Sequence, residues 1–123
     1  DVYFSAFFDA DDTTNEAGKA FVDGFKAWVA EDNTRIENNG GTAEAISSVT
    51  PCGYDAYMAA VYAIEAANST EGPAIRDALA SLSVPGLITG DLSFDENGDA
   101  VKTYAVIKTI KDGQIVYFST YNG

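Results

Sequence analysis

Residues 85–102 read PGLITGDLSFDENGDAVK, and this stretch decides the fold expected for the chain. Two short apolar segments within it, 87–89 and 92–94, contain residues typical of β-strands. The acidic segment that follows contains Asn97-Gly98, a pair that favours a tight turn with positive φ between extended segments. The stretch therefore predicts short strands and a turn.

Three helices are expected before this stretch. Between residues 14 and 31, apolar side chains recur every three or four positions, which indicates an amphipathic helix with Thr13 or Thr14 as its N-cap. Residues 53–67, GYDAYMAAVYAIEAA, are apolar on nearly every side, as in a helix buried from more than one direction. Residues 72–82 begin with Gly-Pro, and proline is favoured at the first helical position.

Strands are expected at both ends of the chain. The apolar run at residues 2–8 predicts a strand covered on both faces, as in a parallel sheet. Residues 104–110 and 114–120 flank Asp112-Gly113, which is a strong hairpin signal. The polar segment 32–50 predicts a long loop with at most one helical turn. This order predicts an α/β fold with three helices packed on a mostly parallel sheet and a C-terminal β-hairpin.

Composition excludes several classes of function. The 123 residues suffice for one domain, and 19 acidic against 7 basic residues give a net charge of -12. Such a surface repels phosphate groups, so neither nucleic acid nor an anionic membrane surface is an expected partner. The chain has no histidine and one cysteine, Cys52, which leaves no Ser-His or Cys-His pair, histidine zinc site or internal disulfide.

The densest acidic cluster does not match a calcium loop. Counted from Asp95, Gly98 falls at position four, whereas an EF-hand loop needs glycine at position six. A carboxylate-dependent hydrolase would require two acids that face one cleft, with Asp11, Asp55 and Asp95 as the candidates. They have no activating partner in the sequence. We therefore expect neither an enzyme, nor a metal site, nor a cofactor.

The helix GYDAYMAAVYAIEAA, the helix GPAIRDALASL and the stretch 85–102 follow one another in an order that resembles a known family. They resemble the last third of type 1 periplasmic binding proteins of the leucine/isoleucine/valine class, the receptors of ABC importers. The resemblance runs from Val2 to Phe118. Because those proteins are considerably longer, we expect this chain to be a fragment of a two-lobed protein. The alternative is a complete small α/β domain with a processed N-terminus.

The resemblance also implies how the chain is divided. Residues 1–12 would form a strand and a segment near the hinge, residues 13–101 part of one lobe, and residues 102–123 the last crossover and a hairpin of the other lobe. An exposed cut through such a protein leaves uncovered strand edges. We therefore expect copies of the chain to associate through these edges.

The function implied by the resemblance is binding of a solute outside the cytoplasm. The ligand would be an amino acid, with branched-chain amino acids as one option, and the partners would be ABC permease subunits. The location would be periplasmic or extracellular, with a lipid anchor in an N-terminal part outside this chain as one option. The alternative is a ligand-sensing domain of a receptor or regulator with the same fold.

Three residues are candidates for ligand binding. The resemblance places Tyr54 against the bound amino acid and Asp55 near its amino group, and both roles suit their chemistry, an aromatic wall and an anion for an ammonium group. Phe8 is a further candidate for the ligand wall. The alternatives are that Asp55 complements the N-terminus of its helix, Tyr54 covers the helix end and Phe8 belongs to the core.

Overall fold

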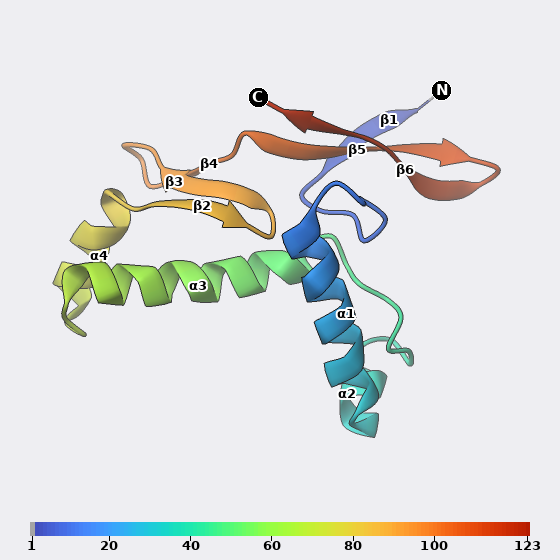
Figure 1. The fold of residues 1–123 in the computed structure, drawn as a ribbon, viewed down its shortest axis with the longest axis horizontal. Coiled ribbons are helices and arrows are strands. Elements are labelled where there is room, and N and C mark those ends of the chain that lie inside the picture. Colours follow the sequence, from blue (N-terminus) through green and yellow to red (C-terminus); the bar gives the residue numbers. More distant parts are fainter. Residues whose placement is uncertain (1) are drawn as a thin grey trace.

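A computed structural model describes residues 2–123 of the chain (Figure 1). Within residues 2–123, four helices and six strands follow one another. Their order is β1 (Tyr3–Ala6), α1 (Glu16–Ala30), α2 (Asn33–Asn38), α3 (Thr50–Ala67), α4 (Gly72–Ala80), β2 (Ser83–Leu87), β3 (Gly90–Phe94), β4 (Ala100–Val101), β5 (Tyr104–Lys111) and β6 (Gln114–Asn122).

The strands form two three-stranded sheets, with orders β1-β5-β6 and β2-β3-β4. The predicted mixture of helices and strands is confirmed, but the prediction of a mostly parallel sheet is wrong. All the strand pairs described are antiparallel. For the β2–β3 and β5–β6 pairs the reason is that their connections are only two residues long, and such short turns can join only antiparallel neighbours.

The first strand also differs from its prediction. β1 lies at the edge of its sheet, and Tyr3 and Phe4 are exposed rather than covered on both faces. An apolar run in the sequence does not distinguish a covered strand from an edge strand whose apolar side chains face outward.

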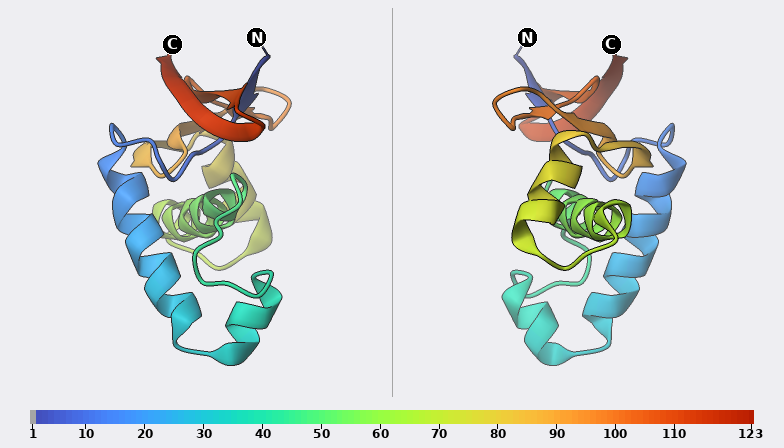
Figure 2. Two further views of the ribbon diagram at one scale, coloured as in Figure 1. Left: turned by 90° about the vertical axis from the view of Figure 1, so that its right-hand side faces the viewer. Right: turned by 90° about the vertical axis from the view of Figure 1, so that its left-hand side faces the viewer.

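The elements divide into two units (Figures 1 and 2). The helical unit comprises α1 to α4 with the β2-β3-β4 sheet, and the terminal sheet comprises β1, β5 and β6. The helices and strands that pack most extensively on one another belong to the same unit. Two segments join the units: the first connection, residues 7–15, and the second connection, residues 102–103.

The core of the helical unit consists of two clusters that meet at the turn between β2 and β3. One cluster places Ala59 of α3 against the inner side chains of the β2–β3 hairpin. The other packs Phe8 of the first connection against Val22 of α1 and Ile88. This turn, residues 87–90, therefore contacts both main helices and is called the junction turn below.

Helix boundaries follow the available caps. Asn15, and not Thr13 or Thr14, caps α1, because its side chain accepts a hydrogen bond from the backbone N–H of Gly18. The segment 32–50 contains a second, unpredicted helix, α2, where the Asp32 carboxylate accepts from two backbone N–H groups. α3 begins at Thr50, three residues before the predicted start.

α3 is less buried than its apolar sequence predicts. Its buried residues, Pro51, Asp55, Ala59 and Ala63, lie along one stripe, whereas Tyr57 is 67% exposed. An all-round apolar helix that is covered on one side only leaves a large apolar surface without a partner in residues 2–123.

The turns agree well with the sequence. Asp112 and Gly113 both have positive φ, as a two-residue hairpin turn of type I′ requires, and Gly98 has positive φ in the acidic turn. Gly90 of the junction turn is more constrained. Its φ is +87°, and a Cβ atom there would lie 2.7 Å from Cβ of Tyr104.

We therefore expect Gly90→Ala to lower the free energy of unfolding by about 2 kcal/mol or more, since both the left-handed backbone and the contact with Tyr104 oppose a side chain. Urea denaturation measures this. The matched control is Gly24→Ala in the middle of α1, where nothing lies within 4 Å of the added methyl group. It should raise stability by up to about 1 kcal/mol. Equal effects of the two substitutions would contradict the packing described.

Candidate functional site

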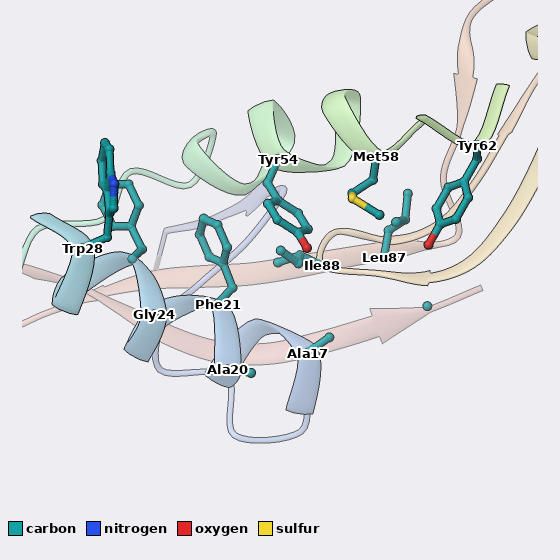
Figure 3. A pocket seen from close by; sticks show the side chains of 12 residues that line it. Ala17, Ala20, Phe21, Gly24, Trp28, Tyr54, Met58, Tyr62, Leu87 and Ile88 are labelled. Carbon is teal, nitrogen blue, oxygen red and sulfur yellow. The ribbon is translucent and has the colours of Figure 1, made fainter. Parts of the chain in front are cut away.

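The largest concavity described lies between α1, α3 and the junction turn (Figure 3). Its volume is about 660 Å³. Uncharged side chains and glycines line it throughout, and we call it the aromatic groove. Its lining residues are Ala17, Ala20, Phe21, Gly24, Phe25, Trp28, Tyr54, Met58, Tyr62, Gly86, Leu87 and Ile88.

Aromatic rings form a continuous row along this groove. Phe21 of α1 and Tyr54 of α3 point toward one another across it, with ring centroids 5.7 Å apart (Figure 3). Phe25 stacks on Phe21 at 5.8 Å, and Trp28 extends the row. The guanidinium carbon of Arg35 lies 4.3 Å from the Trp28 ring centroid, at the outer end. The groove thus suits an apolar surface, and the polar side-chain groups among its lining residues include the hydroxyls of Tyr54 and Tyr62 but no ionised group (Figure 3).

The structure separates the three predicted ligand-binding residues. Tyr54 is 47% exposed and lines the aromatic groove. Phe8 is 2% exposed, and its ring packs edge-on against Phe21, 6.5 Å away between centroids, within the core. Asp55, the neighbour of Tyr54 in α3, lines a different concavity.

Asp55 holds the junction turn. The carboxylate is 3% exposed and lies in the second turn of α3, so it does not complement the helix N-terminus. One oxygen accepts from the backbone N–H of Ile88 at 3.0 Å. The other accepts from the backbone N–H and the hydroxyl of Thr89, at 2.8 and 2.7 Å. These three hydrogen bonds occupy the face of the carboxylate that meets the turn.

The second concavity lies on the other side of α3, with a volume of about 480 Å³. Alanines form much of its wall, and we call it the alanine groove. It is polar at one end only, where Lys102 donates a hydrogen bond to the Thr89 hydroxyl at 2.9 Å. Its lining residues are Phe7, Cys52, Asp55, Ala56, Ala59, Ala60, Leu79, Thr89, Leu92, Phe94, Ala100 and Lys102.

A further polar cluster lies where the two units meet. Asp12, in the first connection, is 3% exposed and accepts hydrogen bonds from the hydroxyls of Tyr104 and Thr120, at 2.7 and 2.8 Å. Its other oxygen accepts from the backbone and hydroxyl of Thr14. Asp9 forms an ion pair with Lys108 of β5 at 2.7 Å.

Sequence reasoning missed Asp9 and Asp12 as structural groups. The sequence feature that could have indicated them is the run Asp9-Ala10-Asp11-Asp12, which lies between an apolar strand and an amphipathic helix. Carboxylates in such a place are expected to face water, and only the fold shows that two of them turn inward to hydroxyls and a lysine more than ninety residues away in sequence.

The hydrogen bonds at Asp12 shift the pKa of Asp12 and of its partner Tyr104. Burial alone would raise the pKa of Asp12, but the hydrogen bonds from Thr14, Tyr104 and Thr120 outweigh it and hold the pKa below 3.8. Burial and the bond to Asp12 raise the pKa of Tyr104 to about 12. Near neutral pH the carboxylate is therefore ionised and the phenol protonated, as the hydrogen bond between them requires.

The acids considered for hydrolysis lie on three separate elements. Asp11 is exposed in the first connection, Asp55 is a buried residue of α3, and Asp95 accepts hydrogen bonds from the backbone N–H groups of Asn97 and Asp99 in the acidic turn. Within residues 2–123, no group of three or more acidic or cysteine side chains could hold a metal ion. None of the helices in this range is long and apolar enough to cross a membrane.

If Asp55 fixes the junction turn, Asp55→Ala should lower the free energy of unfolding by about 3 kcal/mol, because it leaves two buried backbone N–H groups without acceptors. Urea denaturation monitored by circular dichroism measures the loss. Asp77→Ala removes an exposed carboxylate that pairs only with its neighbour Arg76, and should change stability by less than about 0.5 kcal/mol. A similarly small loss for Asp55→Ala would contradict the assignment.

Comparison with known proteins identifies the family. The family model for the receptor family ligand binding region matches residues 3–112. The crystal structure of the leucine binding protein LivK from Thermotoga maritima MSB8 matches with a TM-score of 0.63 and 26% identity, covering 98% of this chain and 31% of LivK. A comparison with curated proteins gave no match. The chain spans less than a third of LivK, and it belongs to the receptor family ligand binding region, with a fold like that of the type 1 periplasmic binding proteins.

Proposed function

We propose that this chain is part of a two-lobed receptor that binds an amino acid outside the cytoplasm and delivers it to an ABC importer. The observation that carries the proposal is the match of nearly the whole chain to a leucine binding protein, over 31% of that protein. Branched-chain amino acids are the ligands that this similarity favours.

The two units support a division between lobes. We propose that the helical unit belongs to one lobe and the C-terminal hairpin to the other, with boundaries near residues 12 and 102. The units are joined by only two short connections, and Asp12 and Lys102 lie in them. An arrangement of two bodies on short connections permits hinge closure around a ligand.

The grooves support a further part of the same proposal. An amino acid carries two charges at neutral pH and needs charged or polar partners in a closed site. The residues that line the aromatic groove offer tyrosine hydroxyls but no charged side chain, and at the polar end of the alanine groove Asp55 and Lys102 already bind Thr89. We propose that the groups which bind the ammonium and carboxylate of the ligand come mainly from a part of the receptor outside this chain.

Among the three residues predicted to bind the ligand, Tyr54 has the most available surface. Its half-exposed ring can serve as a wall once a further part of the receptor covers the aromatic groove. The roles of Asp55 and Phe8 as ligand contacts stay predictions. The internal hydrogen bonds of Asp55 and the burial of Phe8 favour, for both, a role in shaping the site.

Isothermal titration calorimetry with a panel of amino acids tests the proposal. The full-length receptor should bind at least one amino acid, whereas isolated residues 1–123 should show no binding at the same concentrations. Tyr54→Ala should weaken binding by about tenfold through loss of an aromatic contact. The matched control is Tyr57→Ala, because Tyr57 lies on the same helix and is more exposed. Tight binding to the isolated residues would contradict the two-lobed receptor.

We also expect isolated residues 1–123 to self-associate. β1 and β6 are edge strands of the terminal sheet, and Ile115, Phe118 and Tyr121 of β6 are all more than half exposed. Uncovered edges that carry apolar side chains pair readily with other chains, by added strands or by exchange of the hairpin. Multi-angle light scattering should show a mass that rises with concentration. A strict monomer at high concentration would rule out this association.

A further inference from the structure

Asp12 contributes two hydrogen bonds to the contacts between the two units, beside the Asp9–Lys108 ion pair and the close approach of Gly90 to Tyr104. The Asp12 carboxylate lies in the first connection and hydrogen-bonds to Tyr104 at the start of β5 and to Thr120 in β6. Tyr117 of β6 extends this group, since its hydroxyl lies 3.0 Å from that of Thr120. One carboxylate oxygen thus binds both long strands of the terminal sheet.

The same residue is fixed to the helical unit. The second oxygen of Asp12 accepts from the backbone N–H of Thr14 at 2.9 Å. One residue further, Asn15 caps α1 and donates through its side chain to the carbonyl oxygen of Ile88 in the junction turn at 2.8 Å. Hydrogen bonds, together with the peptide link between Thr14 and Asn15, therefore connect β6 through Asp12 to the junction turn.

The energetics of this carboxylate depend on the angle between the units. An ionised group that is 3% exposed is tolerated because its oxygens are occupied by hydrogen bonds. The ion pairs found in residues 2–123 do not include Asp12, so hydroxyls supply much of this compensation. A rotation of the terminal sheet would move Tyr104 and Thr120 away, and would break two of the four bonds.

We propose that Asp12 is a positioning residue that sets the resting angle between the two units. The proposal rests on the proposed function, because the angle matters for binding only if the units move relative to one another around a ligand. Asp12 touches no ligand in this assignment. It acts by making one orientation lower in free energy than its neighbours.

Distances between two spin labels, one on each unit, report changes in the angle between the units. The labels are placed in the full-length protein with the native cysteine removed by Cys52→Ala. Glu65→Cys on α3 and Gln114→Cys at the hairpin turn, both exposed positions, report the distance between the units. A second pair, Glu37→Cys on α2 with Glu65→Cys, lies entirely within the helical unit and reports its integrity.

Three substitutions weaken or remove the proposed contacts. Asp12→Asn removes the charge, Tyr104→Phe removes one hydroxyl donor, and Thr120→Val removes the other without changing the side-chain shape. Each should broaden the distance distribution between the units, with about a tenfold rise in the minor orientations, as expected for loss of a hydrogen bond to a charged acceptor. The distribution within the helical unit should stay unchanged.

The matched controls are Asp23→Asn on the exposed side of α1 and Tyr57→Phe on α3. Neither should change either distribution. An unchanged distribution between the units in Tyr104→Phe and Thr120→Val would overturn the proposal, even if Asp12→Asn failed to fold. Equal broadening of both label pairs would also overturn it, since that result indicates general loosening.

Amino-acid binding measured on the same samples separates this inference from the proposed function. If the wild-type protein binds no amino acid but the three variants broaden only the distance between the units, the receptor function fails and the role of Asp12 holds. If the protein binds an amino acid and the distances do not respond to the substitutions, the role of Asp12 fails and the receptor function holds.

Discussion

The arrangement of this chain depends on the hydrogen bonds between Asp55 and the junction turn. The buried carboxylate of Asp55, in α3, accepts hydrogen bonds from the backbone N–H groups of residues 88 and 89. These bonds fix the turn between β2 and β3. The two core clusters meet at this turn. Both connections also end on it, since Asn15 binds the carbonyl of Ile88 and Lys102 binds the hydroxyl of Thr89. The turn therefore holds one end of each connection to the terminal sheet.

The sequence predicts much of the local structure because local signals are strong here. Asp112-Gly113 needs only its own backbone preferences to form a hairpin turn, and the apolar period of α1 is visible without knowledge of its partners. Sheet direction and the coverage of β1 were predicted wrongly, since both depend on which strands meet. The helix α2 was missed because its stability comes from the Asp32 cap and not from an apolar stripe.

In the candidate site, too, the features that depend on tertiary contacts were not predicted from the sequence. Asp55 was predicted to bind the ligand, which stays a prediction, whereas the partners that it has in the structure lie 33 and 34 positions further along the chain. Asp12 was not singled out at all, because its partners Tyr104 and Thr120 lie 92 and 108 positions away. A sequence indicates that a carboxylate is present, but its burial and its hydrogen-bond partners are determined by tertiary structure.

Polar and apolar contacts are distributed differently within the helical unit and between the two units. Within the helical unit, contacts such as Phe8 against Val22 and Ile88 are apolar, and separating them would expose apolar surface to water at a cost that grows with area. Between the units, Asp12 binds hydroxyls and Asp9 binds Lys108. Water can replace such bonds, so the net free energy lost on separation is small for each. If the units rotate as proposed, these polar contacts favour one orientation at a small cost for leaving it, whereas the apolar clusters hold the elements of the helical unit together.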